Sequence, residues 1–245
     1  MAARIAIPVP HSSDAEYAER AFPQYVEAVE MAGAEVVRIP LDRPPAEVMK
    51  LIERCDGVLL PGSKADVDPS KYNAAAESET APADAKRDTV DELLLQDAYN
   101  MHKPVLGICY GLQILNVYRS GTLLQHIQSP VNHEAGRTVP VAHEVALVPG
   151  SILGGIVTNH ALAVNSSHHQ SAEVVGDGLR VVARCTQDGI IEAIEGTSPD
   201  HFVLAVQWHP ERLVEIDEAS RAIFRAFVEA AQLRHSELAG EYESL

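Results

Sequence analysis

One short segment, Gly107-Ile108-Cys109-Tyr110-Gly111, constrains the fold of this chain more than any other part of the sequence. It follows the apolar run 104–108 and precedes a helical pattern over 112–118, so the cysteine stands between a strand and a helix. Glycine on both sides permits a sharp turn in which backbone approaches backbone. This arrangement is typical of a nucleophile elbow at the C-terminal edge of a parallel sheet.

A thiol in this position is expected to be reactive. A helix N-terminus and a nearby imidazole both favour the thiolate, so we expect the pKa of Cys109 to lie below its usual value of about 8.5. The N–H group of Tyr110 is expected at the start of the helix, where it can donate to an oxyanion. Cys109 is therefore a candidate nucleophile, and the backbone of Tyr110 is a candidate donor.

The candidate base lies a hundred residues downstream, in Gln207-Trp208-His209-Pro210-Glu211. Because Pro210 disfavours helix for the residue before it, we expect an extended segment in which His209 and Glu211 leave on the same side. The carboxylate then holds the imidazole in one tautomer, as in a nucleophile–base–acid triad. Either segment alone also fits a plain turn with a buried side chain, but their combination at two strand ends favours a triad.

Two more polar segments end predicted strands. Pro61-Gly62-Ser63 fits either the other half of an oxyanion hole or an ordinary strand-ending turn. The hexad Asn165-Ser166-Ser167-His168-His169-Gln170 fits support of a substrate or triad, a surface loop or a metal site. No His-x₃-His or carboxylate spacing accompanies it, which argues against a metal. Adjacent histidines on a strand point to opposite faces, so at most one is expected to face the site.

Short apolar runs alternate with helical patterns through the first half of the chain. Strands are expected over 4–9, 35–39, 57–60 and 104–108, and helices over 14–31, 44–54, 89–101 and 112–118. This order predicts an α/β fold, an open and mostly parallel sheet with helices on both faces. Turn-linked runs predict a partly antiparallel second half, with strands over 143–148, 161–165, 179–184, 190–194 and 202–207 and a last helix over 217–233. Because no linker or repeat is evident, residues 1–245 are expected to form a single domain. The loop 63–85 is long and polar, and such loops tend to be functional or mobile.

Composition excludes several classes of protein. The formal net charge of −16 over 245 residues argues against a nucleic acid or an acidic membrane surface as partner. No run of about 18 apolar residues is present, and no secretory signal is evident, so a cytoplasmic protein is expected. The three cysteines include no C-x-x-C pair, which argues against a disulfide framework or a structural zinc site. Cys55 and Cys185 are expected to be buried and structural.

These motifs together resemble the class I glutamine amidotransferase superfamily, and within it the gamma-glutamyl-gamma-aminobutyrate hydrolase group of cysteine peptidases. The superfamily resemblance rests on 107–113 and 207–211, and the branch resemblance on 61–69 and 165–170. It runs from about Ile5 to Phe227 and implies a flavodoxin-like sheet of the amidotransferase type. Tyr110 stands where this branch usually has arginine, which leaves the natural leaving amine open.

The resemblance implies a role for each matching residue. Cys109 is the implied nucleophile, His209 the base and later acid, and Glu211 the group that orients the imidazole. The implied oxyanion hole is made of backbone N–H groups of Gly62, Ser63 and Tyr110, and the implied substrate contacts are Gln113, His168 and His169. No metal or cofactor is implied.

The implied activity is hydrolysis of a γ-glutamyl amide through a γ-glutamyl thioester, which releases glutamate and an amine. The implied partner is a small γ-glutamyl substrate, with no nucleic acid and no membrane, and a homodimer is left open. Two alternatives stay open at this point: a glutaminase subunit that delivers ammonia to a separate synthase chain, and a non-catalytic binding protein of the same fold.

Overall fold

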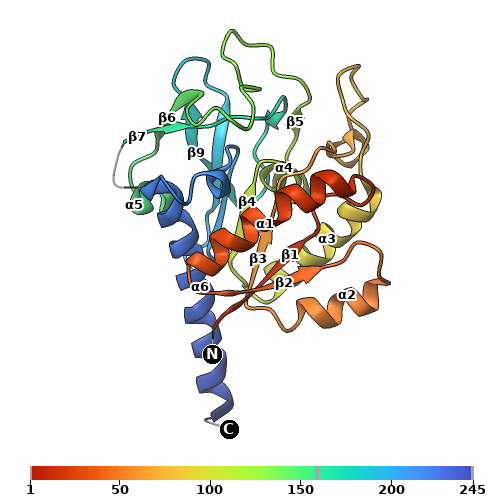
Figure 1. Cartoon of the computed structure of the whole chain (residues 1–245), viewed down its shortest axis with the longest axis vertical. Coiled ribbons are helices and arrows are strands. Elements are labelled where there is room, and N and C mark those ends of the chain that lie inside the picture. Colours follow the sequence, from red (N-terminus) through yellow and green to blue (C-terminus); the bar gives the residue numbers. More distant parts are fainter. Residues whose placement is uncertain (1, 158–159, 244–245) are drawn as a thin grey trace.

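Nine of the eleven strands in this computed structural model, which describes residues 2–157 and 160–243, build one sheet (Figure 1). Its order is β2-β1-β3-β4-β11-β10-β9-β6-β7. The parallel part consists of β1 (Arg4–Pro8), β2 (Glu35–Ile39), β3 (Gly57–Leu60), β4 (Val105–Ile108) and β11 (Val203–Val206). The antiparallel part consists of β10 (Ile191–Gly196), β9 (Leu179–Cys185), β6 (His143–Leu147) and β7 (Ala161–Val164).

Helices cover both faces of the sheet. One core lies between the sheet and the helices α1 (Ala15–Met31), α5 (Ile152–Ile156) and α6 (Glu218–Glu243). The other lies between the sheet and α2 (Pro45–Ile52), α3 (Ala85–Asn100) and α4 (Tyr110–Tyr118). Neighbouring strand residues alternate between the two cores, as Ile5 and Ala6 do. The predicted α/β class, with helices on both faces and an antiparallel portion, is confirmed.

The helix boundaries follow local signals in the sequence. The Asp14 side chain accepts from the N–H of Tyr17 and begins α1, and Asp84 accepts from the N–H groups of Lys86 and Arg87 and begins α3. The predicted start of α3 at residue 89 is therefore wrong by one turn, because its cap lies at the end of the long polar loop. That loop also contains a short 3₁₀ helix, η1 (Pro69–Tyr72).

Three short elements were not predicted. These are α5 and a separate antiparallel pair, β5 (Leu123–Leu124) with β8 (Ser171–Ala172). Two-residue strands carry no periodicity, and a five-residue helix with two glycines has almost no pattern to read. The last helix, α6, extends to Glu243, beyond the predicted end near residue 233.

The central pair of strands positions the candidate site. β4 and β11 are parallel neighbours in which Ile108 pairs with Val206, so Cys109 and Gln207 leave the same edge of the sheet. β11 is the last strand in the sequence, yet it lies between the parallel and antiparallel parts. None of the helices in the described residues is both long and apolar enough to cross a bilayer.

Candidate active site

Cys109 occupies a strained turn between β4 and α4. Its backbone has φ of 54° and ψ of −107°, a conformation that residues other than glycine rarely adopt. A Cβ atom on Gly111 would lie 2.1 Å from the carbonyl oxygen of Leu60, and one on Gly107 would lie 2.8 Å from the oxygen of Gly111. The predicted close approach of backbone to backbone is confirmed, and the strain is typical of a nucleophile elbow.

His209 and Glu211 are joined by a buried contact in which Nδ1 lies 2.8 Å from Oε1. The prediction of an extended segment is wrong beyond His209, since Pro210–Arg212 forms a 3₁₀ turn, η2. Proline begins this turn because its fixed φ suits the first helical position. The turn, rather than strand alternation, brings the carboxylate back to the imidazole.

Asn165 holds the backbone of His209 from the opposite side. Its Oδ1 accepts from the N–H of His209 at 2.8 Å, and its Nδ2 donates to the carbonyl oxygen of His209 at 2.8 Å. Arg212 reinforces the arrangement, because its Nη1 donates to Ser167 Oγ and its Nε lies 3.5 Å from Glu211 Oε1. Sequence reasoning gave Arg212 no role, and it gave Asn165 one only as part of the polar hexad, a candidate support of the substrate or triad.

Burial controls the protonation of the candidate triad. It raises the pKa of the Cys109 thiol to about 12, outweighing the charge of Arg212 and the N–H of Tyr110. Burial also lowers the pKa of His209, against the opposing carboxylate of Glu211. Although burial raises the pKa of Glu211, His209 and Arg212 lower it more, so the group is ionised. The expected thiolate is therefore wrong for this buried arrangement, whose resting pair is a thiol and a neutral imidazole.

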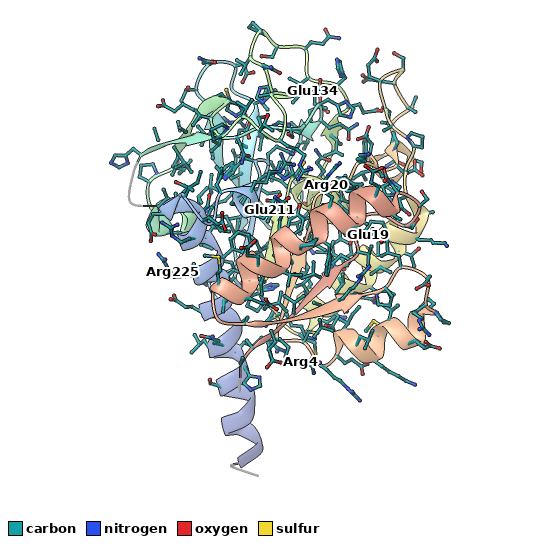
Figure 2. The ribbon with its side chains drawn as sticks, in the orientation of Figure 1. Arg4, Glu19, Arg20, Glu134, Glu211 and Arg225 are labelled. Carbon is teal, nitrogen blue, oxygen red and sulfur yellow. The ribbon has the colours of Figure 1, made fainter. Side chains whose placement is uncertain are left out.

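Cys109 and His209 meet in one pocket of about 270 Å³. Gly62 lies against both of them, since a Cβ there would lie 3.2 Å from His209 Cε1 and 3.7 Å from Cys109 Cβ. His209 Nε2 has no hydrogen-bond partner among the described residues and so is free to accept a proton. Arg20 on α1 and Glu134, in the loop between β5 and β6, are exposed residues of the same pocket (Figure 2).

The three predicted oxyanion donors differ in their surroundings. The N–H of Gly62 already donates to the hydroxyl of buried Tyr25 at 3.0 Å. Ser63 and Tyr110 both line the pocket. The Tyr110 hydroxyl donates to Asp88 Oδ1 at 2.6 Å, which anchors this side chain against α3. Of the three, Gly62 is therefore the one whose N–H already has a partner in the structure.

Gln113, His168 and His169 all line this pocket, each with an existing partner. Gln113 Nε2 donates to the carbonyl oxygen of Gln170 at 3.2 Å, and His169 Nε2 lies 3.1 Å from the carboxylate of Asp66. The expectation that only one histidine faces the site is wrong, because residues 165–170 are not a strand and do not alternate. His168 also reaches inward, toward a buried carboxylate that sequence reasoning missed, Glu192.

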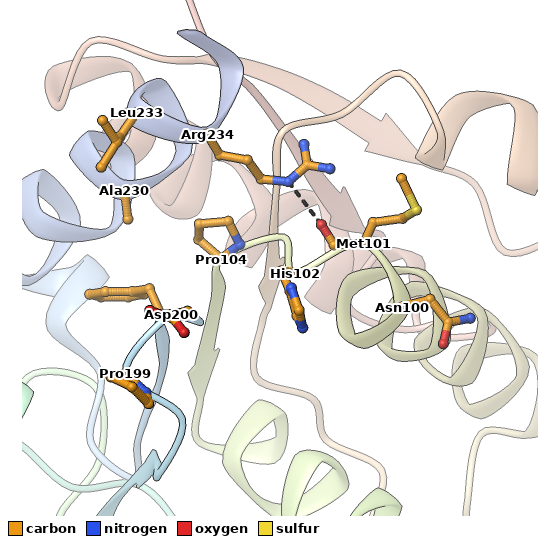
Figure 3. Close-up of a pocket in the computed structure, with 10 residues that line it drawn as sticks. Asn100, Met101, His102, Pro104, Pro199, Asp200, Ala230, Leu233 and Arg234 are labelled. Atoms are coloured by element: carbon orange, nitrogen blue, oxygen red, sulfur yellow. Dashed lines mark hydrogen bonds between the residues drawn. The ribbon is translucent and has the colours of Figure 1, made fainter. Parts of the chain in front are cut away.

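A larger cavity of about 640 Å³ lies at the opposite end of β4 (Figure 3). Met101, Pro104, Phe202 and Leu233 are among its lining residues. Pro104 precedes β4 and Cys109 follows it, so the strand separates this cavity from the elbow. We assign the reaction to the smaller pocket because it contains the thiol, the imidazole and the turn between them.

Comparisons with known proteins identify the family of this chain. Residues 5–211 match the family model described as Peptidase C26. The chain is 33% identical to "Putative glutamine amidotransferase-like protein YvdE" of Lactococcus lactis, over 83% of this chain and 85% of that protein. It is 32% identical to the gamma-glutamyl-gamma-aminobutyrate hydrolase PuuD of Escherichia coli, over 85% of each chain.

A solved structure supports the same fold. The crystal structure of a "putative gmp synthase subunit a protein" from Thermoplasma acidophilum superimposes with a TM-score of 0.68, covering 98% of each chain at 15% identity. At that identity the likeness shows the fold alone. The family assignment rests instead on the match that extends from the first strand to Glu211, the acid of the candidate triad. This chain therefore belongs to the Peptidase C26 family.

Proposed function

We propose that this protein hydrolyses γ-glutamyl amides, with Cys109 as nucleophile, His209 as base and acid, and Glu211 as the group that orients His209. The observation that carries the proposal is the way in which the His209 imidazole is held. Its Nδ1 is fixed by Glu211 at 2.8 Å, while its Nε2 is free in the same pocket as the strained Cys109. The similarity to PuuD, whose name states a gamma-glutamyl hydrolase activity, supports the class of substrate.

The reaction begins from the neutral pair. His209 Nε2 takes the thiol proton as Sγ attacks the γ-carbonyl carbon, and the resulting oxyanion is stabilised by the N–H groups of Ser63 and Tyr110. The imidazolium then gives this proton to the leaving nitrogen, the C–N bond breaks, and a γ-glutamyl thioester and a free amine remain. His209 next takes a proton from water, whose oxygen attacks the thioester, and the thiol and glutamate are released.

Arginines at the pocket favour a leaving amine that also carries a carboxylate. Arg20, Arg137 and Arg212 line it together. Arg137 is exposed, yet slight desolvation and the charges of Arg20 and Arg212 lower its pKa, so these guanidinium groups repel one another even though solvent screens their charges. A carboxylate on the leaving amine relieves this repulsion. The substrate in the name of PuuD, gamma-glutamyl-gamma-aminobutyrate, has such a group, and we propose a substrate of this kind.

The test is glutamate release by the purified protein alone from γ-glutamyl-γ-aminobutyrate, γ-glutamylputrescine and glutamine. We expect the acidic leaving group to be preferred. Cys109→Ala should lower kcat by at least about 10³-fold, because the residues of a triad act as a unit. Cys55→Ala is the matched control, since it removes a buried thiol far from the pocket. Equal release by Cys109→Ala would contradict the nucleophile assignment.

The name of YvdE states a likeness to glutamine amidotransferases, and this likeness supports a second candidate function, a glutaminase that delivers ammonia to a separate synthase chain. The same panel separates the two functions. No release from any compound by the protein alone, with release from glutamine restored by a partner chain, would replace hydrolysis by this second function.

A further inference from the structure

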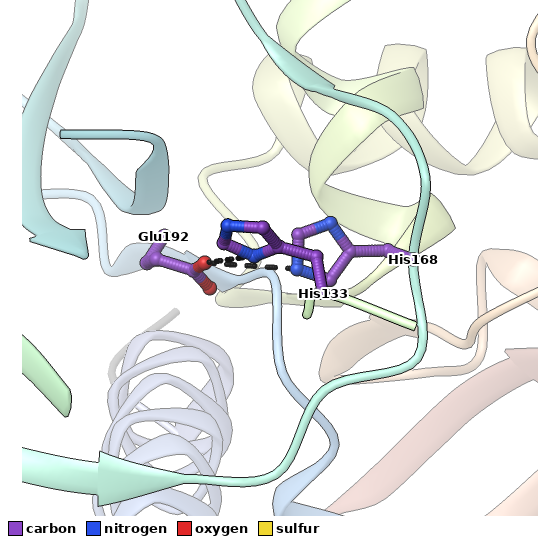
Figure 4. Close-up of side chains that lie close together, drawn as sticks. All are labelled: His133, His168 and Glu192. Atoms are coloured by element: carbon purple, nitrogen blue, oxygen red, sulfur yellow. Dashed lines mark ion pairs between the residues drawn. The ribbon is translucent and has the colours of Figure 1, made fainter. Parts of the chain in front are cut away.

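A buried cluster of histidines surrounds one carboxylate next to the pocket of the candidate active site, and Figure 4 shows two of these histidines, His133 and His168, beside Glu192. His133 Nδ1, His143 Nε2 and His168 Nε2 lie 3.2, 2.9 and 3.6 Å from Glu192 Oε1. All four residues are at most 5% exposed. They come from the loop before β6, the start of β6, the polar hexad and β10, and of the four only His168 also lines the pocket of the candidate active site.

Hydrogen bonds on the far sides of two rings fix their tautomers. His133 Nε2 lies 2.8 Å from Asp188 Oδ2, and His168 Nδ1 lies 2.9 Å from the carbonyl oxygen of Gln170. Both partners only accept, so each of these ring nitrogens carries a hydrogen. The other nitrogen of a neutral ring then presents a lone pair, and in both rings it faces Glu192.

Imidazole nitrogens lie as close as 2.9 Å to the buried carboxylate of Glu192, but among the described residues none is placed to donate to it with good geometry. Neither of its oxygens makes a hydrogen bond of proper geometry with any described residue, and the facing nitrogens of His133, His143 and His168 have none either. A buried carboxylate facing lone pairs is costly, so positive charge must lie between these atoms. It is supplied either by protons on the rings or by one metal cation.

The geometry favours the cation. Burial lowers the pKa of His133, but Glu192 and Asp188 raise it more; a proton on His133 alone still leaves the lone pair of His168 facing Glu192. Protonating both His133 and His168 would place two imidazolium rings 5.0 Å apart, with His143 only 4.7 Å from His133. By contrast, the ligand atoms of His133, His168 and Glu192 all lie within 4.8 Å of one another. The nitrogen-to-oxygen distances of 3.2 and 3.6 Å bracket the edge of a zinc tetrahedron, about 3.3 Å. The two positive charges of a dication also balance the negative charges of the Glu192 and Asp188 carboxylates.

We infer that His133 Nδ1, His168 Nε2 and Glu192 Oε1 bind a transition-metal dication of the zinc class. Nitrogen ligands exclude Ca²⁺ and Mg²⁺ as the preferred occupants. Asp188 and the Gln170 carbonyl act as outer partners that fix the ligand rings, an arrangement common around zinc. His143, which is not part of the group within 4.8 Å, supports Glu192 from outside. His133 also lies near Cys185 and Asp188, but this Asp188 carboxylate already accepts from Ser129.

Burial makes the role of this site structural. The metal would tie the hexad to β10 and thereby hold Gln170, whose carbonyl oxygen accepts from Gln113 in the pocket. This inference is independent of the proposed hydrolysis, because it is read from metal content and spectra rather than turnover.

The test uses the purified full chain after treatment with a chelator. We expect one Zn²⁺ per chain by native mass spectrometry, a higher melting temperature with Zn²⁺, and the intense visible bands of tetrahedral Co²⁺ when Co²⁺ is added instead. Glu192→Gln and His133→Asn should lose this uptake. His201→Asn, a buried imidazole at the other end of the sheet, should retain it. Cys109→Ser should also retain it, which excludes binding by the catalytic thiol.

The Co²⁺ spectrum of the wild-type protein tests the proposed metal site even if the variants fail to fold. Absence of stoichiometric metal and of tetrahedral Co²⁺ bands in the wild-type protein would overturn the inference. Uptake that is lost in Cys109→Ser but kept in Glu192→Gln would overturn it as well.

Discussion

At the scale of single residues, burial decides how Cys109 is activated. The pKa of the thiol is raised to about 12 by burial, and that of His209 lies below its ordinary value of 6.5. The thiol therefore stays protonated until His209 removes the proton during attack. This differs from a preformed thiolate–imidazolium pair, in which the cysteine is ionised before substrate arrives.

The pH dependence of kcat/KM follows from these directions. His209 must be neutral to act as a base, so activity persists as the pH falls to 6.5 and is lost only as the pH falls through the lowered pKa of His209. No inflection from the thiol is expected near its usual pKa of about 8.5. Steady-state rates over this range check the profile. A rate of alkylation by iodoacetamide that stays constant between about pH 5 and 8 would instead indicate a preformed ion pair.

At the scale of secondary-structure elements, Arg87 on α3 links the loops that end β1 and β3. Its guanidinium donates to the carbonyl oxygens of Pro10 and Pro61 at 2.9 and 2.8 Å and pairs with Asp91 at 2.8 Å, all without solvent exposure. Pro61 begins the turn that carries Gly62 and Ser63. The helix thus sets the position of the proposed oxyanion donors.

Arg87→Met should lower the free energy of unfolding by about 3–5 kcal/mol, because it leaves Asp91 buried without its partner. Urea unfolding measures this change. The matched control is Arg43→Met, which breaks a pair of the same i,i+4 spacing with Glu47 but on the exposed surface, and should cost at most about 1 kcal/mol. Equal losses in the two variants would show that burial of the Arg87 pair has no special effect. Arg87→Met with Asp91→Leu should recover part of the loss.

Sequence patterns predicted the elements that are long or sharply bounded, and the residues that share a local motif. Cys109 with its glycines, and His209 with Glu211, were found because their spacing is short. His133 and Glu192 were missed because only the order of β6, β9 and β10 brings them together. The pKa of Cys109 was misjudged for a similar reason, since burial depends on packing from many segments.

At the scale of the whole molecule, the three cysteine thiols differ in their access to a pocket. All are free and buried, but only Cys109 lines the pocket that contains His209. A small electrophile such as iodoacetamide should therefore add once to the native protein, at Cys109, and three times after unfolding. Intact mass with peptide mapping checks this. A first adduct on Cys55 or Cys185 would mean that the elbow thiol is closed to small molecules.

The late position of β11 in the chain has a consequence during synthesis. Because β11 enters the sheet beside β4 and carries His209 just beyond its end, a growing chain contains the thiol long before it contains the base. The two halves of the sheet cannot join across β11 until residues 203–206 have been made. Cys109 and His209 can therefore meet only after more than 200 of the 245 residues have been made, and in a shorter chain on the ribosome the Cys109 thiol has no base beside it.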